Sequence, residues 1–276
     1  MQPPSINDFK KIIWNYYTTQ GRLFDWRHVD DPYKVFISEV MLQQTQTVRV
    51  AQKYPLFIEA FPNFKILADA PLKEVLLQWQ GLGYNRRGMY LQRAAQTIIQ
   101  EHAGILPNDP EVLIKLPGIG KATAASICAF AFNSPTIFIE TNIRAVFIHF
   151  FFANKDSVHD QEIMPLLEES LDKEHSRDWY YALMDYGVML KKTLVNPSRK
   201  SKHHAKQSKF EGSDRQIRGM ILRILTQEPA PILSEDLIAL TKKDPCRVSK
   251  IIEQMVKDKL VLVTGPLIEI GICPTR

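Results

Sequence analysis

Leu116-Pro117-Gly118-Ile119-Gly120-Lys121 is the most informative stretch of this sequence. It joins an apolar helical run that ends at Leu116 to a helical run of small residues over 122–132. Two glycines spaced i, i+2 between helices allow a tight hairpin whose backbone can approach another backbone closely. The amides at the start of the second helix then face outward, where they can bind an anion. The stretch predicts a helix-hairpin-helix that holds DNA phosphate through Gly118, Gly120 and Lys121 without reading bases; a plain tight turn is the alternative.

Helical periodicity continues on both sides of this hairpin through the first 210 residues. Apolar residues recur at spacings of three and four, and Pro and Gly residues separate the runs. No extended period-two alternation occurs in this part of the sequence. We therefore expect an all-α region. The expected helices cover 6–17, 31–41, 48–61, 71–79, 89–101, two around the hairpin within 107–132, 141–152, 161–171 and 178–190.

The last 60 or so residues have a different pattern. Helices are expected over 215–227 and 244–258, with a shorter one for which Ser234 and the acids after it are typical of an N-cap. Two strands over 259–264 and 267–272 flank a Gly-Pro turn. Three helices followed by a β-hairpin is the order of a winged helix; a small helical cap with a terminal hairpin is the alternative. A winged helix would make 244–258 the recognition helix, and docking of a protein partner is the competing role. Its candidate DNA contacts are Arg247, Lys250 and Lys257.

The composition excludes several classes of protein. The 276 residues carry 35 Lys and Arg against 30 Asp and Glu, a net charge of +5, and 45% of them are hydrophobic. This apolar content excludes disorder throughout the chain, and three scattered cysteines exclude a disulfide scaffold. No run of 18 apolar residues and no apolar N-terminal signal core is present, which predicts no membrane association. We expect a cytoplasmic protein, associated with the nucleoid if the source is bacterial.

The basic excess is concentrated in one tract. Residues 191–209 hold seven Lys and Arg, two His and no acid. Clustered Lys and Arg gain affinity for nucleic acid by releasing counterions, although a solvated linker is the alternative. We expect no metal site, because the adjacent His203 and His204 lack cysteines nearby. The candidate phosphate contacts in the tract are Lys191, Lys192, Lys200 and Lys202.

Four further stretches accompany the hairpin. They are Asp31-Pro32-Tyr33-Lys34-Val35, Ser38-Glu39-Val40-Met41-Leu42-Gln43-Gln44-Thr45-Gln46, Trp79-Gln80-Gly81-Leu82-Gly83-Tyr84 and Met184-Asp185-Tyr186-Gly187. In these stretches the chain resembles the helix-hairpin-helix base-excision DNA glycosylases and, within them, the MutY adenine glycosylases. The resemblance covers about residues 5–190. It implies a mainly α, two-lobed helix-hairpin-helix glycosylase fold over 1–190, followed by a basic linker over 191–212 and a small winged-helix-like α+β module over 213–276.

The resemblance also implies roles for individual side chains. Such enzymes act on a base that is flipped out of the duplex. Glu39 would be the general acid that protonates adenine N7, and its apolar neighbours predict a part-buried carboxyl with a raised pKa. The positions that resemble the lining of the base pocket are Trp26, Arg27 and Tyr181. Those that resemble residues probing or wedging the duplex are Gln43, Gln44 and Tyr84.

A second carboxylate is expected at Glu140. The family places an Asp 22 residues after the first hairpin glycine, where it stabilises the oxocarbenium sugar; this sequence has Glu140 there. One extra methylene can move a carboxylate by roughly 1 Å, which matters for pre-organised catalysis. The alternative is an acid that only interacts with the helix dipole. The lysine nucleophile of strand-nicking relatives corresponds to Ala122, with Lys121 one residue away, so we expect no lyase activity.

Two parts of the family pattern are missing. The four-cysteine iron–sulfur loop would follow Met189, but 190–210 contain no cysteine, so we expect no cluster and no other cofactor. The basic tract is expected to replace that loop electrostatically. The winged-helix-like module over 213–276 is too short, and has the wrong strand content, for the domain that reads 8-oxoguanine in the family.

The leading hypothesis is a monofunctional DNA glycosylase that removes a mispaired or damaged base, adenine first, from double-stranded DNA in base-excision repair. One alternative is the same fold acting on uracil, thymine, hypoxanthine or an oxidised purine. The other is a non-catalytic DNA-binding protein or damage sensor. The sequence names no protein partner.

Overall fold

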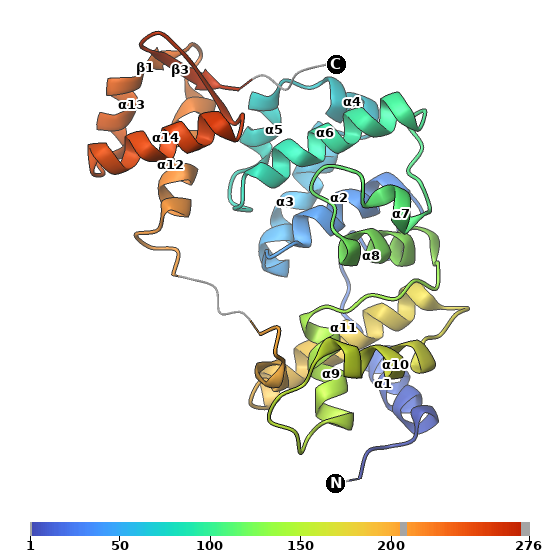
Figure 1. The fold of residues 1–276 in the computed structure, drawn as a ribbon. Coiled ribbons are helices and arrows are strands. Elements are labelled where there is room, and N and C mark those ends of the chain that lie inside the picture. Colours follow the sequence, from blue (N-terminus) through green and yellow to red (C-terminus); the bar gives the residue numbers. More distant parts are fainter. Residues whose placement is uncertain (1, 205–208, 272–276) are drawn as a thin grey trace. The chain divides into compact units, whose positions relative to one another are not determined.

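The computed structural model describes residues 2–204 and 209–271. Within them the chain forms two compact units, which we treat separately. Unit 1 comprises residues 2–35, 108–114 and 119–204, and unit 2 comprises 36–107, 115–118 and 209–271. The expected mainly helical fold is confirmed, with a small antiparallel sheet near the C-terminal end (Figure 1).

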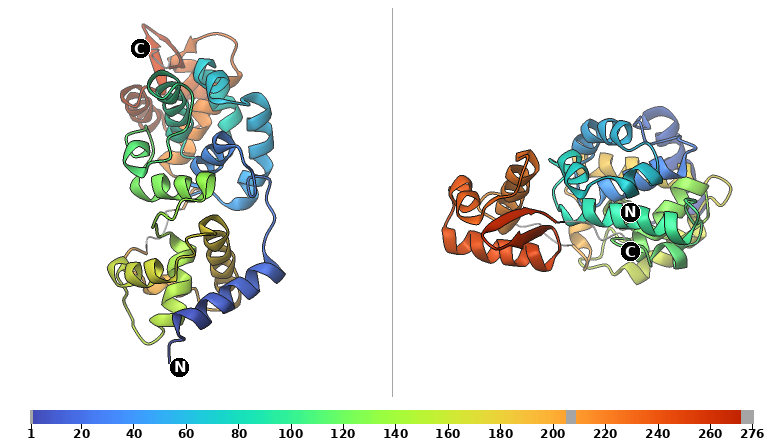
Figure 2. Two further views of the ribbon diagram at one scale, coloured as in Figure 1. Left: turned by 90° about the vertical axis from the view of Figure 1, so that its right-hand side faces the viewer. Right: turned by 90° about the horizontal axis from the view of Figure 1, so that it is seen from above.

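Unit 1 is built of helices around a core rich in aromatic rings. Gly187 explains the close packing of its two central helices, α9 and α11: a Cβ built there would lie 2.4 Å from the carbonyl oxygen of Asn142. Phe9 on α1 lies against Phe147 and Trp179. Helix α11 lies beside both α1 and α9 (Figure 1; Figure 2, left). The elements are α1 (Ile6–Gln20), α7 (Pro110–Leu113), α8 (Lys121–Phe132), α9 (Thr141–Phe151), α10 (Asp160–Ser170), α11 (Ser176–Thr193) and the 3-10 helix η1 (Pro197–Lys200).

Unit 2 combines a helical body with the C-terminal module. Helix α2 (Pro32–Leu42) begins in unit 1 and continues into this body. The other body helices are α3 (Thr47–Ala60), α4 (Phe64–Asp69), α5 (Leu72–Trp79) and α6 (Arg86–Glu101). The module contains α12 (Asp214–Gln227), β1 (Ile232–Leu233), α13 (Ser234–Thr241), α14 (Pro245–Lys257), β2 (Val261–Thr264) and β3 (Leu267–Ile270).

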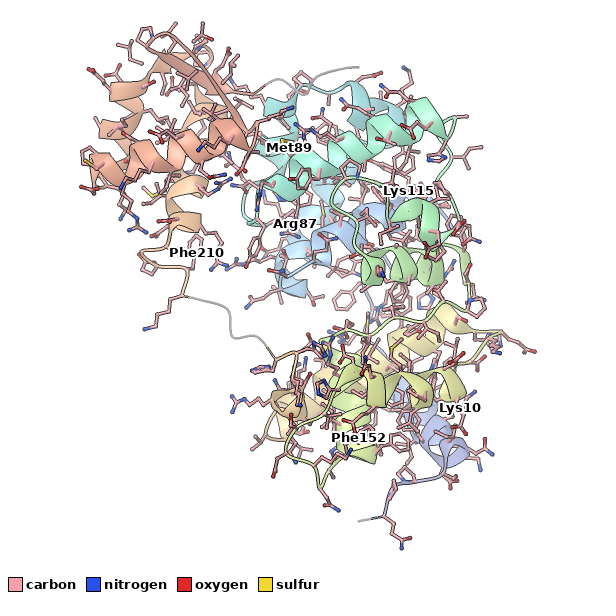
Figure 3. The ribbon with its side chains drawn as sticks, in the orientation of Figure 1. Lys10, Arg87, Met89, Lys115, Phe152 and Phe210 are labelled. Carbon is pink, nitrogen blue, oxygen red and sulfur yellow. The ribbon has the colours of Figure 1, made fainter. Side chains whose placement is uncertain are left out.

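The C-terminal module shares a hydrophobic core with α5 and α6. Leu72, Leu76 and Met89 from these body helices belong to the same buried cluster as Ile221 and Leu225 of α12. Figures 1 to 3 show the orange-to-red module beside α5 and α6, and Figure 3 labels Met89 at this junction. The module and the helical body therefore bury apolar surface against one another.

The sheet of the module has one strand more than the sequence indicated. Its order is β1-β3-β2, all antiparallel, with Ile232 opposite Ile268 and Val261 opposite Ile270. Strand β1 also corrects the predicted N-cap at Ser234. The N-cap is Leu233, because pairing with β3 keeps the chain extended through that residue. The expected end of the last strand, Ile272, lies outside the described residues.

Candidate active site

Glu39 lies on α2, a helix that is apolar on most of its surface. The Asp31 carboxylate accepts a bond from the Tyr33 amide at 3.0 Å, and Pro32 occupies the first position of the helix, where a missing N–H costs little. Phe36, Ile37, Val40 and Met41 are buried, whereas the Glu39 side chain is half-buried. The expected part-buried setting of Glu39 is therefore present.

A guanidinium clamps the end of this helix to the turn before α6. Arg87 occupies a half-buried position on α6, and burial lowers its pKa to about 10. The bonds satisfy carbonyls that a helix leaves open at its C-terminus and tie them to the turn between α5 and α6. Its acceptors, at 2.8–3.1 Å, are the carbonyl oxygens of Val40, Met41, Leu82 and Gly83 and the hydroxyl of Thr45.

Two of the predicted duplex-probing residues have a left-handed backbone. Gln44 has φ 55° and Tyr84 has φ 47°, and neither is glycine. Such conformations cost of order 1–3 kcal/mol and persist where the surroundings enforce them, commonly at functional sites. The bonds from Arg87 supply that enforcement on both turns. Gln43, the third predicted probe, donates from Nε2 to the carbonyl oxygen of Gly118 at 3.3 Å.

The two glycines of the hairpin differ: Gly118 lies where a side chain would be strained, whereas Gly120 has φ −95° and a Cβ built there would meet no neighbouring atom within 4 Å. Gly118 has φ 78°, and a Cβ there would lie 2.9 Å from the Cβ of Tyr90. Gly120 is the N-cap residue of α8, and Lys121 is its first residue. All three hairpin residues are exposed, so amides and a cationic side chain face solvent together.

The residues predicted for the base pocket lie in unit 1 around a buried carboxylate. Asp185 accepts bonds at 2.8 Å from both terminal nitrogens of Arg27 and at 2.7 Å from the amide and Nε of Arg22. The guanidinium of Arg27 lies 4.3 Å from the ring centre of Tyr181. Trp26 is buried and stacks on Phe24 at 4.7 Å. Burial alone would raise the pKa of Asp185, but the bonds and charges of Arg27 and Arg22 outweigh it and lower that pKa.

Glu140 is the N-cap residue of α9. Its Oε1 accepts bonds from the amides of Asn142 at 2.8 Å and Ile143 at 3.2 Å. Its Oε2 accepts from Nδ2 of Asn142 at 3.2 Å, and Lys191 donates to Oδ1 of that same amide at 2.7 Å. Burial lowers the pKa of Lys191, although the negative charge of Glu140 acts to raise it. Glu140 is thus a half-exposed carboxylate held at a helix N-terminus, a geometry compatible with either predicted role.

The basic tract divides into anchored and exposed lysines. Lys191 is held by Asn142, and Lys200 donates to the carbonyl oxygen of Ala153 at 2.7 Å. Lys192 and Lys202 are exposed. Lys206 lies outside the described residues.

The residues do not fit an iron–sulfur cluster. A cluster of this family needs four thiolates, and the chain has three cysteines. Cys128 is buried in α8 and Cys246 is exposed on α14. Within 2–204 and 209–271, no group of three or more His, Cys, Asp or Glu residues could hold a metal ion.

Among the helices of the described part of the chain, none is long and apolar enough to span a bilayer.

Two residues that organise the site were not assigned by the sequence. Arg87 resembles any exposed helical arginine in sequence, and its acceptors lie up to 47 positions away. Asp185 stood in a family-like stretch, but its partners, Arg22 and Arg27, are more than 150 residues distant. The one available signal was that the helical spacing places Asp185 on the buried face of its helix. An acid is almost never fully buried unless it is paired, so a cationic partner was to be expected.

Comparisons with known proteins agree with this geometry. The HhH-GPD superfamily base excision DNA repair protein family matches residues 37–173. "Adenine DNA glycosylase" of Buchnera aphidicola (subspecies Baizongia pistaciae) is 38% identical over 184 residues, which are 66% of this chain and 52% of that protein. "Adenine DNA glycosylase" of Mycobacterium tuberculosis is 28% identical over 285 residues, which are 95% of this chain and 92% of that protein. The chain thus spans about half the length of the Buchnera relative and nearly all of the mycobacterial one.

A solved structure supports the fold. A thermostable thymine-DNA glycosylase superposes with a TM-score of 0.58 at 24% identity, over 67% of this chain and 89% of that one. The expected kinship with helix-hairpin-helix glycosylases of the MutY type is confirmed. The Gly118–Gly120 hairpin, the helix of Glu39 and the turn of Tyr84 are therefore parts of a shared scaffold, and the chain belongs to the HhH-GPD superfamily of base excision DNA repair proteins.

Proposed function

We propose that this chain is a monofunctional DNA N-glycosylase that removes adenine from a mispair in double-stranded DNA. The observation that carries the proposal is the half-buried Glu39 on a helix whose end Arg87 locks to the Tyr84 turn. An acid on a fixed helix beside two strained turns suits proton transfer to a base that those turns help to extrude. The names of the Buchnera and mycobacterial relatives support adenine as the target.

In this proposal Glu39 donates a proton to N7 of the extruded adenine. The bond between N9 and the sugar C1′ then breaks, and its electron pair leaves with the base, which departs neutral. The sugar becomes an oxocarbenium cation, which the carboxylate of Glu140 stabilises. A water molecule adds its oxygen to C1′ and gives up a proton, which restores the Glu39 acid and leaves an abasic site. The hydrogen bonds from Asn142 and Ile143 keep the Glu140 carboxylate oriented at the start of α9.

The same residues argue against strand cleavage by a lysine. The position of the family nucleophile is Ala122, while Lys121 opens α8 one residue earlier. One helical residue turns a side chain by about 100°, so Lys121 points in a different direction from a side chain at 122. We propose that Lys121 serves with the amides near Gly118 and Gly120 as a phosphate contact instead.

Duplex DNA is held, in this proposal, without an iron–sulfur cluster or any other cofactor. The exposed Lys192 and Lys202 are the described members of the basic tract that best suit phosphate contact, with Lys191 and Lys200 anchoring the tract. DNA as the substrate implies work on the chromosome, in the cytoplasm and associated with the nucleoid if the source is bacterial.

A duplex panel tests the proposed activity. Single-turnover reactions on duplexes containing adenine opposite guanine, 8-oxoguanine, cytosine or thymine would be quenched in hot alkali, which cleaves abasic sites. Parallel duplexes would carry uracil, thymine or hypoxanthine as the target. We expect alkali-dependent cleavage at adenine and intact strands without alkali. If another base is excised preferentially, that base replaces adenine as the proposed target. If no duplex is cleaved, the enzyme proposal fails and a non-catalytic DNA-binding protein is the remaining alternative.

A further inference from the structure

A large pocket lies within unit 2, between the helical body and α12. Its volume is about 950 Å³. The walls come from the turns after α2 and α5, the start of α6, and one face of α12. Figure 3 labels a residue on each side of it, Arg87 on the body and Phe210 just before α12. Among the described residues that line it there is no Asp or Glu, whereas six are arginines: Arg49, Arg86, Arg87, Arg215, Arg218 and Arg223.

This charge distribution selects an anion. A concave surface lined by one sign of charge, with low-dielectric walls, concentrates the potential inside it. Asp258, outside the lining, pairs with Arg218 and with Arg86. Arg49 and Arg223 are exposed, on the body side and the α12 side of the pocket. The pocket therefore offers guanidinium groups from two separate elements to one bound anion.

Aromatic rings in the same wall add a second kind of recognition. The hydroxyl of Tyr84 accepts a bond from Arg215 at 2.7 Å, and the Arg215 guanidinium lies 5.2 Å from the Tyr84 ring centre and 5.4 Å from that of Phe210. Phe210 is 53% exposed. Arginines interleaved with part-exposed rings are the features that hold nucleotides, the guanidinium at the phosphate and the ring against the base.

Of the three predicted DNA contacts on α14, Arg247 makes contacts within the module, whereas Lys250 and Lys257 are exposed. Arg247, at the start of α14, donates to Asp214 at 2.5 and 2.8 Å and to the carbonyl oxygen of Gly212 at 2.8 Å. These bonds fasten α14 to the start of α12. Arg247 thus has a structural role within the module, whereas the arginines of α12 line the pocket with Tyr84.

We propose that the C-terminal module binds DNA through α12 and that this arginine pocket holds a nucleotide other than the one being excised. This inference rests on the proposed function. Glu39 does not line the pocket, so the excised base is not its occupant. Gln43, Gln44 and Tyr84, the predicted probes of the duplex, do line it. The phosphate is assigned to Arg49 and Arg223, exposed arginines from the two sides of the pocket. The nucleotide comes either from the strand of the excised base or from the opposite strand, and the two sources share this phosphate chemistry.

Charge neutralisation on each side of the pocket tests the inference. Arg49→Gln and Arg223→Gln would be compared with Lys243→Gln, an exposed lysine of the same module outside the pocket. Affinity for an adenine-mispair duplex would be measured by fluorescence anisotropy from 50 to 200 mM salt. We expect each arginine variant to bind about five- to tenfold more weakly, with the slope of log K against log salt smaller by about 0.9. Lys243→Gln should retain the wild-type slope.

Neutral phosphates locate the nucleotide. Methylphosphonates would replace single phosphates along each strand in turn. One replacement should weaken wild-type binding and add no further loss in Arg223→Gln, because the same contact has been removed twice. The strand on which it falls identifies the source of the nucleotide.

Two outcomes would overturn the inference. One is unchanged affinity and salt slope in both arginine variants with normal thermal melting. The other is a larger loss in Lys250→Gln on α14 than in Arg223→Gln, which would assign DNA binding to α14. Because these measurements report binding, they remain informative if excision of adenine is absent. Conversely, if the wild type excises adenine while both arginine variants bind DNA normally, only the role of α12 is contradicted.

Discussion

At the scale of single residues, Asp185 is the buried charge on which unit 1 depends. Its side chain is inaccessible to solvent, and that of Arg27 is 3% exposed. Removing one partner of such a pair leaves an uncompensated charge in the core. Asp160 is a suitable comparison, because it also makes a two-point contact with an arginine, Arg144, but both side chains are 17–20% exposed.

We predict that Asp185→Asn lowers the free energy of unfolding by about 3 kcal/mol, against about 1 kcal/mol for Asp160→Asn. The lowered pKa of Asp185 also fixes the sign of the pH dependence. Its contribution is complete above the pKa of the unfolded carboxyl, near 4, and is lost as the pH falls through the lower folded value. Urea unfolding between pH 3 and 6 checks this. An acid dependence equally steep in Asp185→Asn would contradict the assignment.

Glu140 tests whether charge or capping is the function of the second carboxylate. Gln at this position keeps the length of the side chain and an oxygen that accepts the amide bonds at the start of α9, but removes the charge. We predict normal thermal stability for Glu140→Gln and a single-turnover rate at least about 100-fold lower. Glu140→Asp keeps the charge but shortens its reach, and we expect a smaller loss of about tenfold. Wild-type excision by Glu140→Gln would reduce Glu140 to a helix cap.

At the scale of elements, the contact between α9 and α11 depends on one missing side chain. A Cβ at Gly187 would lie 2.4 Å from a carbonyl oxygen of α9, whereas a Cβ at Gly219, also inside a helix, would meet no atom within 4 Å beyond its own stretch of helix. We predict that Gly187→Ala destabilises the protein by at least about 2 kcal/mol and slows excision by displacing Asn142 and Glu140. Gly219→Ala should stabilise it by about 0.4–1 kcal/mol. Denaturant unfolding compares them, and equal effects would refute the packing argument.

The elements that the sequence predicted are those with strong local signals. Asp244-Pro245 opens α14 as expected, because the Asp244 side chain caps the amide of Arg247 at 2.8 Å and proline suits the first helical position. Strand β1 and helix α4 were not predicted. Strand β1 has only two residues, which is too short to show the alternation of a strand. Helix α4 has six residues and makes too few turns for an apolar face to be recognised in the sequence.

The residues of the candidate site could be predicted from the sequence, but the contacts that hold them in place could not. The glycine hairpin and the stretch from Ser38 to Gln46 are contiguous in sequence, so a local pattern reveals them. The clamp by Arg87 and the arginine pocket join α2, α6 and α12, which only tertiary packing brings together. The periodicity of one segment does not indicate which carbonyl oxygens an arginine on a distant segment will bind.

At the scale of the whole molecule, the C-terminal module is a structural part of unit 2. Its shared core with Leu72, Leu76 and Met89 means that removing it would expose apolar surface on α5 and α6. We predict that a chain truncated after residue 209 melts at a lower temperature and aggregates. In the full chain, differential scanning calorimetry should show the module unfolding together with α5 and α6. A truncated chain as stable and monodisperse as the full one would contradict this dependence.

The proposed adenine glycosylase activity depends on Glu39 of α2 as the acid that protonates the base. The most direct measurement is the single-turnover excision of adenine from a mispair by the wild type, Glu39→Gln and Glu59→Gln, the last neutralising an exposed acid on α3. All three proteins should bind the duplex with similar affinity. We predict excision at the wild-type rate by Glu59→Gln and a loss of at least about 1,000-fold in Glu39→Gln. Undiminished excision by a folded, DNA-binding Glu39→Gln would contradict it.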